Sequence, residues 1–338
     1  MRPAPSVILL TTLIGVGQGL FLALFSAQTY ALVGLLPRTD SRVFYAQGSA
    51  VALAFLSAGL IASFFHLGRP ERAWRTATQW RSSWLSREVI ALPAFMLAVV
   101  LYGAAHALSW NPVIATLPQG LAIDAAVALG LAGSVLAFAL FVCTAMIYAC
   151  LPFLAEWHTP LTLVNYTLLG AASGFTLAAA LAASLAAGLS SPVAPHLVPF
   201  FAGWAIVLTV FAALGRIAAL RRNARLAPKS TSQSAIGVKH PTVVQKSQGF
   251  MGGSFNTREF FHGRGAQALR NVKWAFLLLT FVLPLPGLAL GLALDPYRGA
   301  ALWLALAFAV QYLGLLAERW FFFAQANHPQ NLYYQAVA

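Results

Sequence analysis

Long apolar runs, separated by much shorter polar connections, are the feature that most limits how this chain can fold. Each run is long enough to cross the roughly 30 Å hydrocarbon core of a bilayer as a helix. The chain is 59% hydrophobic and only 9% charged, which is too apolar for a soluble domain. The sequence therefore predicts an all-α, polytopic integral membrane protein with eight transmembrane helices, at residues 6–36, 46–66, 88–109, 123–151, 161–188, 196–218, 273–294 and 300–324.

The predicted spans form a single membrane domain over residues 1–338, interrupted by a long basic loop at 221–272. The first apolar run is much longer than that of a signal peptide, so we expect it to be retained as a helix. Pro284 and Pro286 predict kinks in the seventh span. Glycines that permit close approach of a neighbouring helix occur in the first and fifth spans: Gly15, Gly17, Gly19, Gly170 and Gly174.

The basic residues predict the orientation of these spans. Eight spans place both termini on one face, here called the terminal face. Of the 21 Lys and Arg residues, only Arg38, Arg42 and Arg298 fall on the opposite face. Because cytoplasmic loops carry the excess of Lys and Arg, we expect a multi-pass protein of the inner (plasma) membrane with both termini cytoplasmic. The net charge of +13 does not indicate nucleic-acid binding, because the charges lie beside apolar spans, where orientation and lipid headgroups account for them.

The most individual stretch is residues 64–88, where one apolar span ends at His66 and the next begins on Glu88. Between them lie arginines and tryptophans, residue types that settle at the membrane–water boundary. Apolar side chains recur at helical spacing in this segment and would allow a short helix that lies in the interface. They are Ala73, Ala77, Trp80 and Trp84. An anchored loop is the preferred interpretation.

The polar residues that the membrane would otherwise exclude predict a site near the terminal face. A buried imidazole, His66, and a carboxylate, Glu88, would meet there and accept protons from a lipid-soluble hydroxyl compound. Side chains expected to approach from neighbouring helices are Gln18, Tyr148, Asn165 and His158. The alternative is structural, since an interfacial histidine anchors a helix and a glutamate at a helix N-terminus is stabilised by the helix dipole.

The sequence offers no obvious redox centre or metal site. Cys143 and Cys150 fall inside one predicted span without a paired CxxC motif, so we expect no iron–sulfur cluster in this chain. His106 and His196 lie on the face opposite His66, which makes facing axial ligands for haem hard to arrange. A haem-containing cytochrome anchor and a polytopic transporter remain the alternative functions, although the inverted repeats of transporters are not found.

Several segments resemble one family: HLGRPERAWR with WLSRE, PFLAEWHTPLTLVNY, SFNTREFFHG and AERWFFFAQANHPQNLYYQ. They are similar to the DmsC family, the membrane anchor subunits of dimethyl sulfoxide reductase-type molybdoenzymes. The resemblance implies a non-catalytic, eight-helix anchor that binds quinone or quinol (menaquinol or ubiquinol). It also implies an iron–sulfur electron-transfer subunit that in turn carries a molybdopterin catalytic subunit. The family's quinol-binding histidine and glutamate match His66 and Glu88.

The loop at 67–87 is richer in arginine and tryptophan than in the dimethyl sulfoxide reductase anchors, and is closer to anchors of quinone-linked sulfite dehydrogenases. The expected function is therefore electron transport in anaerobic or sulfur-compound respiration. A basic surface suited to an acidic partner or to anionic lipid is predicted from the segment 252–265 and four arginines. These are Arg69, Arg72, Arg75 and Arg81.

Overall fold

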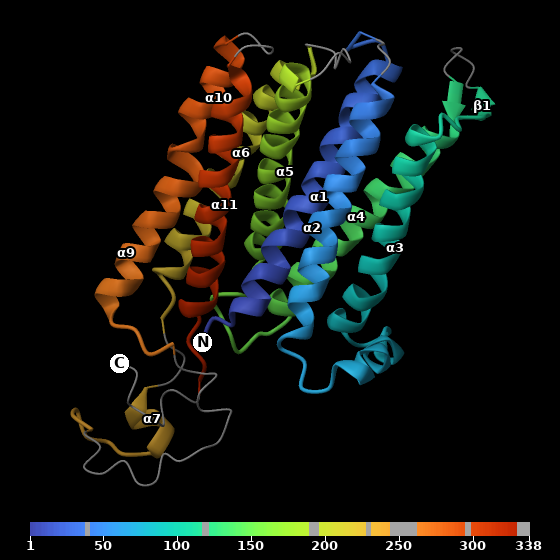
Figure 1. Cartoon of the computed structure of the whole chain (residues 1–338). Coiled ribbons are helices and arrows are strands. Elements are labelled where there is room, and N and C mark those ends of the chain that lie inside the picture. Colours follow the sequence, from blue (N-terminus) through green and yellow to red (C-terminus); the bar gives the residue numbers. More distant parts are fainter. Residues whose placement is uncertain are drawn as a thin grey trace.

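The computed structural model describes residues 1–37, 41–116, 122–188, 196–227, 231–243, 262–294 and 299–329. Eight helices in this part of the chain are long and apolar enough to cross a membrane, which confirms the predicted fold class (Figure 1). Their bounds are α1 (Pro5–Leu32), α2 (Arg42–Phe64), α3 (Trp84–Ala107), α4 (Ala125–Ala149), α5 (Pro160–Gly188), α6 (Leu197–Asn223), the seventh span (Ala266–Ala293) and α11 (Ala300–Ala324).

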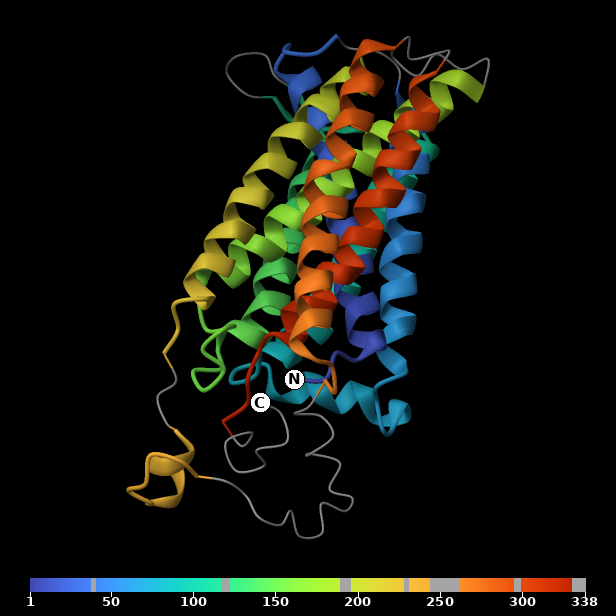
Figure 2. The same ribbon diagram turned by 90° about the vertical axis from the view of Figure 1, so that its left-hand side faces the viewer.

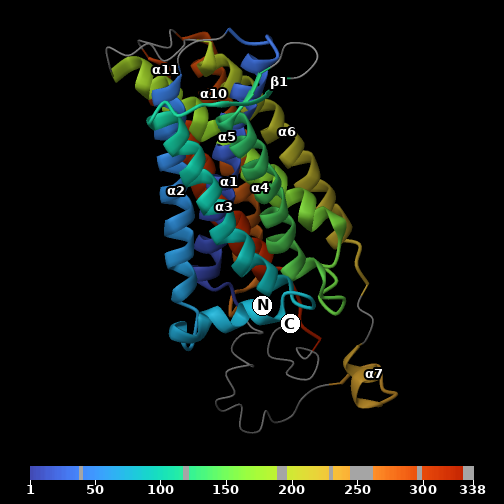
Figure 3. The same ribbon diagram turned by 90° about the vertical axis from the view of Figure 1, so that its right-hand side faces the viewer.

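Helix α1 lies at the centre of the bundle and is the most buried of the spans. It packs against α2, α4, α5 and α11, and Figure 3 shows it behind α2, α3 and α4. A helix surrounded on most sides by other helices must be apolar all round, and the side chains of Leu20, Phe21 and Leu24 are fully buried. The hydrophobic core therefore follows α1 along its length.

The closest helix contact joins α1 to α5 through glycine. A Cβ added at Gly19 would collide with the carbonyl of Gly170, and one at Gly174 would collide with the backbone of Gly19 and Leu20. Small residues let helix backbones approach in this way, and the gain in van der Waals contact helps to hold spans together in lipid. The packing role predicted for these glycines is confirmed.

The seventh span is built from three segments: α9 (Ala266–Leu277), the π-helical turn η2 (Leu278–Val282) and α10 (Pro284–Ala293). In the wider turn, the Leu283 amide donates to the Leu278 carbonyl at 2.9 Å. Pro284 follows directly, so the helix changes type at one of the two prolines where kinks are predicted. The span also begins seven residues earlier than predicted.

The connections divide between two faces (Figures 1 and 2). The terminal face carries the N-terminus, the end of α11, the short helix α7 (Ser232–Ile236) and the 3₁₀-helix η1 (Pro70–Gln79). Because Pro70–Gln79 form a helix, the anchored loop preferred from the sequence is the wrong interpretation for these residues. The opposite face carries an antiparallel hairpin of β1 (Val113–Thr116) and β2 (Ala122–Asp124), which is not predicted from the sequence.

Substitution of Gly174 by alanine tests the α1–α5 contact. Because the new methyl group would meet backbone atoms of α1, Gly174→Ala should cost roughly 1–3 kcal/mol of stability. Gly203→Ala in α6 is the matched control, since its Cβ would meet open space, and it should leave stability equal or slightly higher. Thermal unfolding of the purified chain in detergent measures both. Equal midpoints for Gly174→Ala and the wild type would contradict the close contact.

Candidate functional site

Glu88 lies deeper in its helix than the sequence predicts. Helix α3 begins at Trp84, and the Ser83 side chain caps it by accepting from the Ser86 amide at 3.4 Å. Glu88 is therefore the fifth residue of the helix, beyond the first turn where the helix dipole acts on charge. Its side chain is buried, with 6% of its surface exposed. Stabilisation by the helix dipole is therefore a weak explanation for the presence of this carboxylate.

The partner of Glu88 is a neutral hydroxyl on the neighbouring helix. Thr144 of α4 donates a short hydrogen bond from Oγ1 to Oε1 of Glu88. Among the described residues, no Lys, Arg or His side chain forms an ion pair with Glu88. A buried carboxylate is costly unless it is paired or protonated, so a neutral partner leaves this group free to exchange a proton.

His66 is exposed just beyond the end of α2, so the expectation of a buried imidazole is wrong. Partial desolvation lowers the pKa of His66 below its ordinary value of 6.5, which favours the neutral imidazole near pH 7. No hydrogen bond or ion pair joins it to Glu88 within the described residues. The intervening segment is held to α3 by Arg87, which donates to the carbonyls of Trp80 and Arg81, both at 2.9 Å.

The other predicted site residues divide into interior and surface groups. Gln18 is buried and donates from Nε2 to the Ala137 carbonyl at 2.8 Å, and Asn165 is buried on α5. Tyr148 of α4 stacks on Tyr166 with ring centroids 5.9 Å apart. His158, by contrast, is exposed on the terminal face. The structure therefore places Gln18, Tyr148 and Asn165 in the bundle interior, with Tyr148 close enough to interact electrostatically with Glu88, and leaves His158 outside.

The predicted basic surface is present on η1 and the residues next to it. Arg69, Arg72, Arg75 and Arg81 are all exposed. Two of them lie over tryptophan rings, Arg75 over Trp74 at 5.5 Å and Arg81 over Trp80 at 5.3 Å. Of the segment 252–265, residues 252–261 lie outside the described part of the chain.

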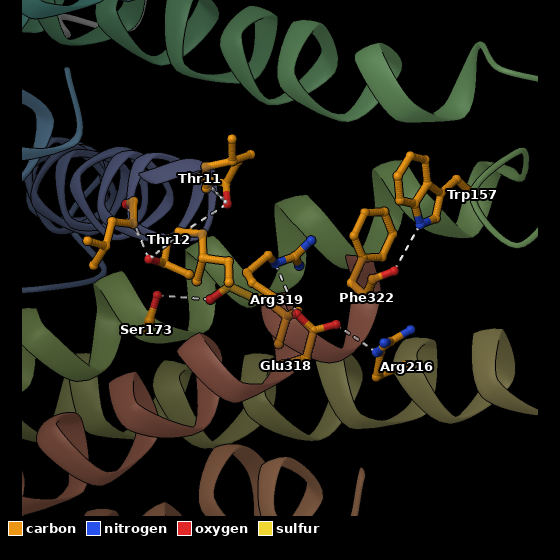
Figure 4. Close-up of polar contacts among 12 residues, drawn as sticks. Thr11, Thr12, Trp157, Ser173, Arg216, Glu318, Arg319 and Phe322 are labelled. Atoms are coloured by element: carbon orange, nitrogen blue, oxygen red, sulfur yellow. Dashed lines mark hydrogen bonds and ion pairs between the residues drawn. The ribbon is translucent and has the colours of Figure 1, made fainter. Parts of the chain in front are cut away.

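A buried cluster of three charges is the main polar feature that is not predicted from the sequence (Figure 4). Glu318 of α11 forms ion pairs through Oε1 with Arg216 Nε at 2.7 Å and through Oε2 with Arg319 Nε at 2.9 Å. From the sequence, both arginines are assigned to the basic residues of the terminal face, but the structure buries them inside the bundle. Their position within apolar runs is a signal that could have revealed them, because ionisable residues in a span generally face a partner.

Aromatic rings enclose this cluster. The Arg319 guanidinium lies 3.9 Å from the ring centroid of Tyr166, and the Arg216 guanidinium lies 5.3 Å from that of Phe276. Cations over ring faces are stabilised by the ring quadrupole, especially where water is excluded. The cluster therefore joins α5, α6, α9 and α11 by electrostatic contacts as well as by packing.

Removal of the shared carboxylate tests the cluster. Glu318→Gln leaves two buried guanidinium groups without a counter-charge and should destabilise the chain by roughly 3–5 kcal/mol. Glu71→Gln is the control, because its pairing with Arg72 at 3.8 Å is exposed and such pairs contribute little. Thermal unfolding and the amount of chain recovered in membranes are the measurements. Wild-type behaviour of Glu318→Gln would contradict a structural role for the cluster.

Comparison with known proteins gives two matches that cover most or all of the chain. The family described as DMSO reductase anchor subunit (DmsC) matches residues 3–236. The chain is also 55% identical over 338 residues to the C subunit of sulfite dehydrogenase from Allochromatium vinosum, and the match covers 100% of both proteins. With the eight membrane-spanning helices, these matches confirm the resemblance predicted from the segments around His66 and Glu88: the chain belongs to the DmsC family of membrane anchor subunits.

Proposed function

We propose that this chain anchors a sulfite dehydrogenase-type molybdoenzyme and exchanges electrons between quinone in the bilayer and an iron–sulfur subunit docked on the terminal face. The full-length similarity to the C subunit of a sulfite dehydrogenase supports the choice of complex. In this proposal the molybdopterin and the clusters belong to partner subunits. Among the described residues, no group of three or more His, Cys, Asp or Glu side chains is arranged to hold a metal ion.

The observation that carries the quinone site is the buried carboxylate of Glu88, whose hydrogen-bond partner among the described residues is the neutral hydroxyl of Thr144. A quinol supplies two electrons and two protons when it is oxidised, so its site needs a group that can accept a proton. Glu88 can do this without first breaking an ion pair. Exposed His66 suits the entry side of such a site, because its imidazole can bind a hydroxyl or carbonyl oxygen at the membrane boundary.

The exposed arginines near η1 support a docking role for the same face. Arg69, Arg72, Arg75 and Arg81 form a positive surface next to the proposed quinone site. Complementary charge steers association and fixes the orientation of partners. An acidic iron–sulfur subunit bound there would bring its cluster close to the quinone. Gln18, Tyr148 and Asn165 then support Glu88 from inside the bundle, and His158 belongs to the surrounding surface.

Substitution of Glu88 tests the proton-accepting role. Glu88→Gln keeps the oxygen that accepts from Thr144, so the complex should assemble normally. An amide cannot accept the proton, so quinone-coupled turnover should fall by roughly 10²–10⁴-fold. The measurement compares this turnover with activity toward an artificial soluble electron acceptor. Glu71→Gln on η1 is the control, and normal quinone turnover in Glu88→Gln would reject the role.

Reporter fusions test the orientation that the docking proposal needs. The basic loops on the terminal face lead us to expect both termini in the cytoplasm. Fluorescent-protein fusions at residue 338 and within 231–243 should therefore be active, and alkaline phosphatase fusions at the same points should be inactive. The opposite pattern at both positions would place the docking surface in the periplasm.

A further inference from the structure

Two small enclosed cavities lie in the bundle interior next to the Glu88 site. The first has about 20 Å³ of space for water and is lined by polar groups that include Gln18, Thr144 and Ser173. The second has about 10 Å³ and is lined by polar groups that include Asn165 and Arg216. Each is enough for roughly one water molecule. Tyr166 and Arg319 line both cavities, so the two cavities are neighbours on either side of these side chains.

The residues that line the two cavities connect Glu88 with the terminal face. At the inner end, Thr144 lines the first cavity and donates its hydroxyl to Glu88. At the outer end, half-buried Glu156 lines the second cavity and also a groove of about 640 Å³ between α6, α9 and α11. The link that carries Glu156 is fixed under α6, because Asn223 Nδ2 donates to the Glu156 carbonyl at 3.3 Å. Polar groups therefore follow one another from Glu88 to the terminal face.

Buried polar atoms without protein partners line these cavities. They are the Asn165 Oδ1, Arg216 Nη2 and Arg319 Nη1 atoms. A buried donor or acceptor left unsatisfied costs about 1–3 kcal/mol, and native proteins meet this cost with enclosed water. Three such atoms around two water-sized spaces are difficult to explain by packing alone. They are the expected lining of a short chain of ordered waters.

We propose that these cavities form a hydrated path that carries protons between Glu88 and Glu156 on the terminal face. The inference rests on the proposed function, because it assigns the route of the proton that Glu88 exchanges. In quinol oxidation, the two O–H bonds of the quinol break one after the other, and Glu88 takes up each proton in turn while the two electrons pass to the iron–sulfur partner. Glu88 then gives its proton through the Thr144 hydroxyl to the cavity waters. Each hydroxyl or water gains one proton and releases another, so none is changed after the transfer. Quinone reduction uses the same path in reverse.

The charges along the path permit a proton to pass. Two guanidinium groups, Arg216 and Arg319, would repel a hydronium ion if they stood alone. Glu318 lies between them at ion-pair distance, and Glu88 and Glu156 lie at the two ends. The Met1 ammonium also interacts with Glu156, so three carboxylates face two arginines and one ammonium and leave no excess of positive charge when all are ionised. The buried cluster thus lines the path without closing it.

Two substitutions that change the lining but keep the packing test this path in the assembled complex. Tyr166→Phe removes only the hydroxyl between the cavities, and Asn165→Leu replaces an amide by an apolar side chain of similar size. Each should lower quinone-coupled turnover by up to about 10²-fold, as the loss of a proton-transfer group does. Activity with an artificial soluble acceptor should not change. Tyr102→Phe is the matched control, because Tyr102 is equally buried but donates to Gln28 on α1, outside the path.

The solvent isotope effect separates a blocked path from a general disturbance. If proton transfer becomes rate-limiting in Tyr166→Phe and Asn165→Leu, the ratio of turnover in H₂O to that in D₂O should rise above the wild-type ratio. A lower rate with an unchanged ratio would overturn the path. Normal turnover in both variants, beside a loss in Glu88→Gln, would also overturn it while leaving the proposed function intact. Normal turnover in Glu88→Gln would reject the proposed function, and the path with it. If Tyr166→Phe does not assemble, Asn165→Leu decides alone.

Discussion

Polar groups inside this bundle must find partners within the protein, because the hydrocarbon core of a bilayer offers no water. Most of its buried hydroxyls meet this demand locally. Ser173 and Thr176, for example, donate to the carbonyls of Leu169 and Ala172, each at 2.9 Å and each four residues earlier on α5. Arg216 and Arg319 pair their Nε atoms with Glu318, although Nη2 of Arg216 and Nη1 of Arg319 keep no hydrogen-bond partner among the described residues. Some of the groups that fit neither pattern line the two small cavities, and others, such as His106 and Gln311, lie elsewhere in the bundle. The proposed chemistry is placed beside Glu88 because this carboxylate is buried and accepts from Thr144.

The glycine contact between α1 and α5 makes this arrangement possible. Because the backbones meet at Gly19 and Gly174, polar side chains on the same two helices, Gln18 and Ser173, come to line one cavity. Larger residues at the contact would push the two helices apart and change the shape of that cavity. The packing of the central helices and the position of the polar lining therefore depend on the same small residues.

The spans, the glycine contact and the position of Glu88 near the terminal face could be predicted from the sequence. Hydropathy reports spans directly, since the bilayer sets their length. The pairing of Arg216 with Glu318 could not, because it joins residues about a hundred positions apart and depends on which faces of α6 and α11 meet. The burial of His66 was predicted wrongly for a related reason. A residue at the end of a span can point into the bundle or out of it, and periodicity does not distinguish the two at a helix terminus.

The residue at which α3 begins decides how Glu88 is interpreted. If α3 began at Glu88, the helix dipole alone would explain the carboxylate, and no function would be needed. Because it begins at Trp84, Glu88 lies beyond the first turn, where it is buried and, within the described part of the chain, paired only with Thr144. If electron transfer and proton release are both directed to the terminal face, as we propose, turnover at Glu88 would carry no net charge across the bilayer. An anchor arranged in this way passes electrons to or from its partner without itself contributing to the membrane potential.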